Sequence, residues 1–477
     1  MGVLADLLVR APGRPGLNVA LWALAGVAAL TLLDRRRTDP AAPEARWLVG
    51  GALGFAIILM LRDAEALAVF SLFAAVVLLV VAAGRAAAGW ASRAQLSDGV
   101  FAVLRVGLLC AAGPLGWGRG APHPSPRPDS WTRQARTIVR GALMALPALV
   151  VLTALLMSAD PVFARLVEAM FVIELEPLLE HVLVAAVIAW LTAGYLRAFL
   201  VPDDDILDRL RIPRPALSPA EVSVALWILN ALFVVFMAVQ LRYLFGGSSL
   251  VEVTSGLTYA EYARRGFFEL VVAAALVVPM MLLADWAAAP EPGHSRRALR
   301  LTMLVLVALL VGVIASAAYR MWLYQDAYGL TEPRLYGAMF MLWLTVVLVW
   351  LVLTVLRGRR ERFAFGGIVA GVGAIALLNL INPHALIARV NLDRAATGEE
   401  YDGTYLTSLS ADAVPTLLSR LGQLPDAERS RAACLLAERW TGDRPGGWRT
   451  WNLSDWRARR LVAAEGGERC EEVGDRR

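Results

Sequence analysis

The chain has 477 residues, of which 58% are hydrophobic and 18% are charged, whereas soluble proteins average about 45–50% and about 25%. All 46 of its Lys and Arg residues are arginine, which excludes lysine-dependent chemistry such as P-loop phosphate binding and Schiff-base catalysis. Four histidines and three cysteines supply few metal ligands, and we expect no cofactor.

Ten apolar blocks approach the length of about 20 helical residues that crosses a membrane. They predict spans at 16–33, 46–61, 66–83, 138–157, 182–200, 220–240, 267–284, 301–318, 336–356 and 364–381. The second is short, and an interfacial helix is its alternative. The block 99–117 carries Arg105 in its middle, which costs a few kcal/mol in a membrane, so we interpret it as interfacial or re-entrant. The predicted fold class is all-α, a polytopic transmembrane helical bundle of about ten spans.

The arginines orient this bundle, because cytoplasmic loops are enriched in basic residues. With ten spans and the N-terminus outside, the cytoplasmic loops hold 22 arginines and the outer segments 9. Counting 99–117 as a span with the N-terminus inside gives 18 against 12. The ten-span arrangement is therefore preferred, and both arrangements place the C-terminus outside. A net charge of +5 that arises in this way does not indicate nucleic-acid binding.

The last part of the chain differs in composition from the spans. Residues 382–477 hold 14 Arg and 15 Asp+Glu, which indicates a small helical extracytoplasmic domain or tail after a transmembrane domain at 1–381. Asp426 follows Pro425 and is predicted to open a helix that ends near Trp440, and Ser454 is a candidate N-cap for another. Cys434 and Cys470 either form a disulfide, if the compartment is oxidising, or are two unpaired thiols.

Polar side chains gather at the outer ends of the spans. They define a candidate polar site at the outer face that consists of Asp160, Gln240, Arg242, Tyr259, Glu261, Tyr262, Arg264, Arg265, Glu269, Arg320, Tyr324 and Arg334. Glu269 lies one turn inside a span, where a carboxylate needs a partner, so it indicates either a functional site or a structural ion pair. The tyrosines are interpreted either as a pocket lining or as an aromatic belt.

Structural roles are the alternative for several of these positions. Thr258 and Glu261 have the spacing of a capping box, and Glu261 can pair with Arg265 four residues later. Asn379, Asn382 and His384 follow the last span and are interpreted as end caps.

Two connections share a pattern, in which Gly-Leu-Thr stands between two spans. The two copies begin at Gly256 and Gly329, so 220–284 and 301–356 are proposed as a parallel repeat of one helical hairpin, as transporters use.

The motifs LMSADPVFA (156–164), LFGG (244–247), TYAEYARRGFFEL (258–270), NPHALIARVNL (382–392) and LSADAVPTL (409–417) are similar to those of an uncharacterised bacterial family of multi-pass membrane proteins. The resemblance extends from about residue 138 to 455. It implies a bacterial envelope protein. Together with the predicted spans and the arginine count, this predicts a multi-pass protein of the bacterial cytoplasmic (inner) membrane with both termini outside. That family has no established activity, so it transfers no catalytic residues.

The sequence favours a non-enzymatic membrane protein, transport-like before sensor or scaffold, with an enzyme as the last of three classes. The first is a non-enzymatic transport-like or lipid-handling protein, with the lipid bilayer and lipid head groups as partners. The second is an envelope sensor or scaffold whose C-terminal domain receives an envelope partner. The third is an enzyme for a lipid-linked substrate, with Asp160, Glu261 and Glu269 as acid or base and arginines as phosphate ligands.

Overall fold

The computed structural model describes residues 1–9, 15–36, 43–88, 106, 110, 175–200, 219–255, 267–288, 294–399, 401–442 and 447–474. Within these ranges, side chains are described except at 9, 84–88, 175–180, 239–255, 267–273, 294–295 and 465–474. The regular secondary structure of this part of the chain is helical, with no strand. This confirms the all-α class.

The chain divides into two compact units, residues 1–10 with 108–197 and residues 11–107 with 198–477. In the first unit, α1 (Gly2–Val9) packs against α8 (Leu175–Leu200). A Cβ on Gly2 would lie 2.1 Å from the carbonyl oxygen of Ala185, so glycine permits this close approach. Nδ1 of His181 lies 2.7 Å from Oδ2 of Asp6 in the same pair of helices.

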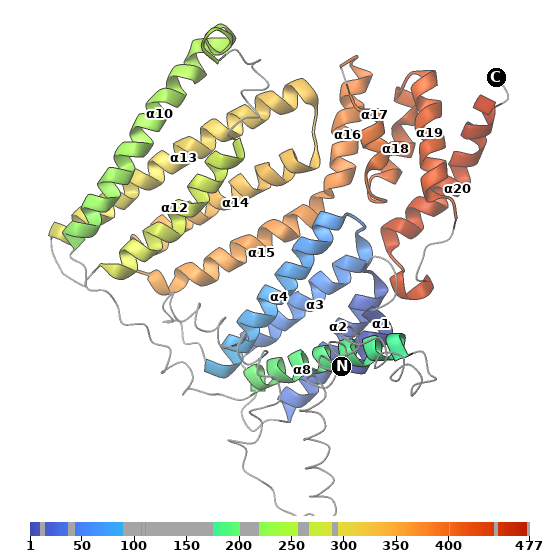
Figure 1. The fold of residues 1–477 in the computed structure, drawn as a ribbon, viewed down its shortest axis with the longest axis horizontal. Coiled ribbons are helices and arrows are strands. Elements are labelled where there is room, and N and C mark those ends of the chain that lie inside the picture. Colours follow the sequence, from blue (N-terminus) through green and yellow to red (C-terminus); the bar gives the residue numbers. More distant parts are fainter. Residues whose placement is uncertain are drawn as a thin grey trace, which may run out of the picture. The chain divides into compact units, whose positions relative to one another are not determined.

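In the second unit, α3 (Pro43–Leu61) packs against α2 (Leu17–Arg35) and α4 (Glu65–Ala88). A second group is centred on α13 (His294–Tyr328), which packs against α10 (Pro219–Ser255), α12 (Phe267–Ala287) and α14 (Glu332–Thr354). The next helix, α15 (Phe363–Ile381), packs against both α14 and α4 and so joins the two groups (Figure 1).

Eight helices in the described part of the chain are long and apolar enough to cross a membrane. They are Leu17–Arg35, Pro43–Leu61, Glu65–Ala83, His181–Leu200, Pro219–Ala238, Arg296–Tyr328, Glu332–Thr354 and Arg360–Ile381. Each coincides with a predicted span, including the short second block. The predicted span 267–284 falls on α12, whose assessed apolar part, Ala274–Ala287, is shorter. The span 138–157 lies outside the described residues, as does 99–117 apart from Val106 and Cys110.

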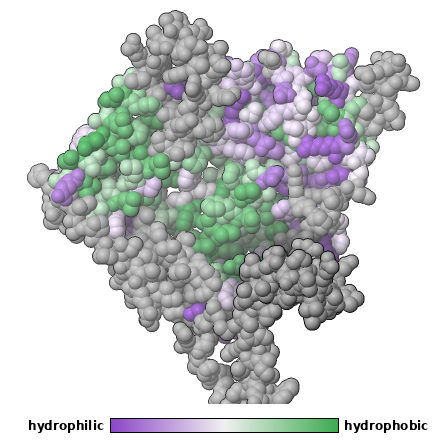
Figure 2. Space-filling model, in the orientation of Figure 1, coloured by the Kyte–Doolittle hydropathy of each residue, from purple (hydrophilic) through white to green (hydrophobic). Residues whose placement is uncertain are grey.

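These helices are apolar on their outer as well as their inner faces. On α10, for example, Ile228 and Leu232 are exposed while Val222 and Leu226 are buried. A helix that is hydrophobic all round is typical of a membrane span, and the outer faces are available to lipid. Figure 2 shows hydrophobic residues over the α10–α15 part of the view and hydrophilic residues over the helices that follow α15. The protein is therefore a polytopic membrane protein.

The helices after α15 share a hydrophobic core of their own, and we call residues 383–464 the C-terminal segment. It contains α16 (Pro383–Ala396), α17 (Gly403–Ser408), α18 (Val414–Arg420), α19 (Asp426–Trp440) and the described side chains of α20 (Leu453–Gly474). Its core includes Ile387, Leu392, Leu406 and Leu436, and Leu330 from the α13–α14 connection joins it.

The expectations for this segment have different outcomes. The helix predicted from Asp426 to near Trp440 is confirmed. The prediction that Ser454 caps the last helix is wrong, because Ser454 lies inside the first turn of α20 and Oδ1 of Asn452 accepts the hydrogen bond from the Asp455 N–H at 3.1 Å. Cys434 is disulfide-bonded, and the side chain of its predicted partner Cys470 lies outside the described set.

Candidate functional site

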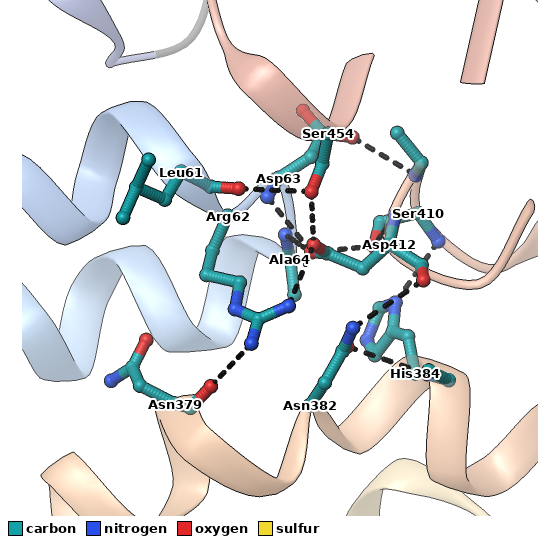
Figure 3. Close-up of polar contacts among 12 residues, drawn as sticks. Leu61, Arg62, Asp63, Ala64, Asn379, Asn382, His384, Ser410, Asp412 and Ser454 are labelled. Carbon is teal, nitrogen blue, oxygen red and sulfur yellow. Dashed lines mark hydrogen bonds and ion pairs between the residues drawn. The ribbon is translucent and has the colours of Figure 1, made fainter. Parts of the chain in front are cut away.

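The carboxylate of Asp412 is the centre of a buried polar network at one end of the membrane helices (Figure 3). Its side chain is 0% exposed, and its Oδ2 accepts hydrogen bonds from the backbone N–H groups of Asp63 at 2.8 Å and Ala64 at 2.9 Å. These N–H groups belong to the two residues that directly precede α4, at the end where a helix lacks internal acceptors for its first amides. Asp412 therefore caps α4 from the C-terminal segment, and its negative charge suits a helix N-terminus.

The two connections that meet here also exchange a bond in the opposite direction. Oδ2 of Asp63 accepts from the backbone N–H of Ala411 at 3.2 Å. The α3–α4 connection and the 409–413 turn thus bind each other by reciprocal hydrogen bonds. These bonds fix the position of one backbone relative to the other.

Arg62 balances the charge of this arrangement. Its NH1 lies 3.7 Å from Oδ1 of Asp412, and its NH2 donates to the carbonyl oxygen of Asn379 at 2.7 Å. Asn379 stands near the end of α15, where carbonyl groups lack partners within the helix. Arg62 therefore connects the α3–α4 connection, α15 and the C-terminal segment.

Two residues at the start of α20 bind the end of α3. Asn452 donates to the carbonyl oxygens of Leu59 at 3.1 Å and Arg62 at 2.7 Å. The hydroxyl of Ser454 lies 2.6 Å from Oδ1 of Asp412 and 2.9 Å from the carbonyl oxygen of Leu61. Since a hydroxyl has one proton to donate, the two acceptors share it. The C-terminal end of α3 is thus satisfied by side chains from α20.

His384 forms the other side of the network. Its Nδ1 accepts from the backbone N–H of Ser410 at 2.9 Å, which places the proton of the neutral ring on Nε2. Nε2 lies 3.2 Å from Oε2 of Glu332, in the first turn of α14. The backbone N–H of Glu332 donates to the hydroxyl of Tyr405 at 3.0 Å. Burial raises the pKa of Tyr405, so this phenol is neutral at physiological pH.

The α13–α14 connection is held by Asn391 of α16. Its Oδ1 accepts from the N–H of Leu330 at 2.9 Å and its Nδ2 donates to the carbonyl oxygen of Leu330 at 2.7 Å. Gly329, the residue before Leu330, has a φ of +73°, and a Cβ on it would lie 2.2 Å from Oδ1 of Asn391. This contact explains why glycine begins the second Gly-Leu-Thr element.

The network therefore acts as a set of hydrogen-bonded caps. The carboxylate of Asp412 is surrounded by two backbone N–H groups, two hydroxyls and one guanidinium, so its oxygen atoms are occupied by contacts within the protein. In the part of the chain that the structure describes, no group of three or more His, Cys, Asp and Glu residues could hold a metal ion.

A family model described as a domain of unknown function (DUF4153) matches residues 49–419. The chain belongs to this family. No curated protein and no solved structure is detectably similar to it. The DUF4153 match confirms the resemblance to an uncharacterised family, and it begins earlier and ends earlier than the expected 138–455. It includes Arg62, Asp63, His384 and Asp412, whereas Asn452 and Ser454 lie beyond it.

Most residues of the predicted outer-face site lie outside what the structure describes of this DUF4153 protein. Asp160, Tyr259, Glu261, Tyr262, Arg264 and Arg265 are outside the described residues, and Gln240, Arg242 and Glu269 lie in helices at positions where side chains are not described. The predicted capping box at Thr258 and the first Gly-Leu-Thr element are also outside. The convergence of this site and the hairpin repeat therefore stay predictions.

The other three predicted site residues are described, and two of them meet. The guanidinium of Arg334 lies 4.0 Å from the ring centroid of Tyr324 and donates to the carbonyl oxygen of Gly329. Arg320 is buried, one turn before Tyr324 on α13. The Arg334–Tyr324 contact closes the α13–α14 connection, which is a structural role.

The sequence did not predict the Asp412 network. The interpretation of Asn379, Asn382 and His384 as end caps is right for Asn382, whose Oδ1 accepts from the N–H of Ala385 at 3.4 Å at the start of α16. The family motifs at 382–392 and 409–417 were the available signal for His384 and Asp412. Nothing in the pattern paired them with Arg62 and Asp63.

Proposed function

We propose that this protein is a non-enzymatic bacterial envelope sensor. In this proposal, the C-terminal segment lies outside the cytoplasm, receives a ligand or an envelope partner there, and passes the event to the membrane helices through the Asp412 network. The observation that carries the proposal is that Asp412 and its neighbours bind the ends of α3, α4 and α15 directly. A displacement of the C-terminal segment must therefore break or move the caps of the membrane helices.

Charge and redox chemistry support the orientation. The connections at the end of the bundle opposite the network, 285–300 and 357–363, hold seven arginines, as expected for cytoplasmic loops. There, Asp285 pairs with Arg296 at 3.4 Å and with Arg360 at 2.6 Å. The disulfide at Cys434 fits the oxidising compartment outside the cytoplasmic membrane.

Transport is the second candidate, and one observation favours it. Asn230 on α10 is 1% exposed and donates to the carbonyl oxygen of Thr302 at 3.0 Å, while its Oδ1 has no hydrogen-bond partner among the described residues. An unpaired amide oxygen inside a membrane helix group is a candidate contact for a polar solute. A single amide is weaker support than the network, which joins the ends of α3, α4 and α15.

The orientation is tested by labelling in intact cells. Glu438 is exposed on α19 and Arg357 is exposed at the opposite end of the bundle. In a chain with Cys110→Ser, we expect Glu438→Cys to react with a membrane-impermeant maleimide and Arg357→Cys to react only after lysis. The reverse pattern would place the C-terminal segment in the cytoplasm and contradict the proposal.

The transmission step is tested by hydrogen exchange of the protein in lipid nanodiscs. Asp412→Asn loosens the network, and a sensor should then show faster exchange at the α14–α15 connection (355–362) as well as at 62–64. Asp393→Asn, which breaks an exposed ion pair with Arg420 on the same segment, is the control. Faster exchange at 62–64 with an unchanged 355–362 would mean that the segment is a static scaffold.

A further inference from the structure

A group of exposed tryptophan and arginine side chains lies where the C-terminal segment meets the end of a membrane span. It consists of Trp448, Arg449, Trp456, Arg457 and Arg460, from η4 (Gly447–Thr450) and the first turns of α20. Trp448 is 61% exposed and Trp456 is 45% exposed. We call these five residues the Trp–Arg patch.

The depth of the patch follows from its contacts with α2. The backbone N–H of Leu17, the first residue of α2, donates to the carbonyl oxygen of Trp451 at 2.9 Å. A Cβ on Gly16 would lie 2.6 Å from the same oxygen, so the backbones of the α2 start and the η4 end are in close contact. Because α2 is a candidate span that begins at Leu17, the patch lies beside the end of a candidate membrane span.

The charge of the patch is positive. Residues 447–460 contain four arginines and one aspartate, and that aspartate, Asp455, is paired with Arg459 at 3.0 Å. Among the described residues, Arg449, Arg457 and Arg460 have no acidic partner. The guanidinium groups of Arg449 and Arg460 lie 6.0 and 5.3 Å from the ring centroids of Trp448 and Trp456, so cations and aromatic rings form one surface.

A cavity of about 420 Å³ adjoins the patch between η4 and α20. Its lining includes Trp451, Asp455, Trp456, Arg459 and Arg460. It opens beside tryptophan rings and guanidinium groups. Guanidinium groups bind phosphate, and tryptophan rings pack against lipid at the membrane interface, so this environment suits a phospholipid.

We propose that the Trp–Arg patch binds anionic phospholipid head groups of the leaflet that surrounds the start of α2. The tryptophan rings lie at the head-group level, as aromatic residues do at membrane interfaces, and the three arginines bind lipid phosphates. This contact holds the C-terminal segment against the bilayer surface independently of the Asp412 network, and it goes beyond the proposed sensor function.

The test is the lipid preference of the full chain in native mass spectrometry. The detergent-solubilised protein is titrated with phosphatidylglycerol and, separately, with phosphatidylcholine. Each basic residue near an anionic surface strengthens binding several-fold, so Arg449→Ala/Arg457→Ala/Arg460→Ala should weaken retention of phosphatidylglycerol by roughly ten- to a hundredfold. Retention of phosphatidylcholine should change little.

The matched control removes three arginines elsewhere on the C-terminal segment, at Arg389, Arg429 and Arg431. An equal loss of phosphatidylglycerol binding in the control would show a general charge effect and overturn the proposal. Unchanged binding in the patch variant would overturn it as well.

A second measurement tests the rings. In nanodiscs with brominated phosphatidylcholine, Trp448→Phe/Trp456→Phe should reduce the fraction of tryptophan fluorescence that is quenched, because two interfacial rings are removed. If the quenched fraction rises instead, the two rings face water.

Discussion

Oδ2 of Asp412 lies 2.8 Å from the backbone nitrogen of Asp63, a residue 349 positions earlier in the chain. Through this bond and the one from the Ala64 N–H, a turn in the C-terminal segment supplies the acceptor for the backbone directly before a membrane helix. Water and lipid are poor substitutes at a buried helix end, because an unpaired backbone amide there costs about 1–3 kcal/mol. The backbone N–H groups at the N-terminal end of α4 therefore have their acceptor only while the C-terminal segment stays in this position.

We expect Asp412→Asn to lower the free energy of unfolding by about 3 kcal/mol, because it leaves the charge of Arg62 without its buried partner. Thermal unfolding in detergent, followed by tryptophan fluorescence, measures the change. The control Asp393→Asn breaks an exposed pair and should cost less than about 1 kcal/mol. Equal losses in the two variants would show that the buried charge of Asp412 contributes no more to stability than the exposed charge of Asp393.

Gly329→Ala should be more destabilising than Gly398→Ala. Both glycines have positive φ, +73° and +82°, so both substitutions strain the backbone by about 1 kcal/mol. At Gly329 the new Cβ would also lie 2.2 Å from Oδ1 of Asn391, whereas Gly398 has open space around it. The same unfolding assay gives the difference, which we expect to exceed about 1 kcal/mol. Matching losses would mean that the Asn391 side chain moves away without cost.

Asn452→Ala and Ser454→Ala should have different effects on α20, because Asn452 caps this helix whereas Ser454 contacts the end of α3. Asn452→Ala removes the N-cap of α20, worth about 1 kcal/mol, together with hydrogen bonds to the carbonyl oxygens of Leu59 in α3 and Arg62 directly after it. Hydrogen exchange in the first turn of α20 should therefore accelerate in Asn452→Ala and stay unchanged in Ser454→Ala. Fraying of α20 in Ser454→Ala alone would restore Ser454 as the cap.

Tyr405 should contribute a pH-dependent term to stability at alkaline pH. Because burial raises its pKa, the folded state holds the phenol proton more tightly than the unfolded state. The stabilisation is complete below the unfolded pKa of about 10 and is lost as the pH rises through the higher folded value.

Tyr405→Phe is therefore expected to lose about 1 kcal/mol at neutral pH, since the N–H of Glu332 loses its acceptor, and to show a shallower fall in stability above pH 10. An alkaline profile for Tyr405→Phe identical to that of the wild type would argue against this role.

The sequence by itself determined which segments are membrane helices. Apolar blocks such as 301–318 and 336–356 fall on α13 and α14. A helix that crosses a membrane needs a minimum length and an apolar composition, and both can be read from consecutive residues of the sequence. The helix from Asp426 to Trp440 was likewise predictable, since Pro425 and the acidic first turn are local signals.

Only the tertiary structure decided which polar residues form the candidate site. Asp412, Asn452 and Ser454 act on carbonyl and amide groups 348 to 393 positions away, and no local pattern specifies a partner at that separation. Ser454 shows the consequence, because a serine near a helix start has the local signature of a cap whether or not a neighbouring helix takes its hydroxyl. Its role depends on where α3 ends, which is fixed by packing.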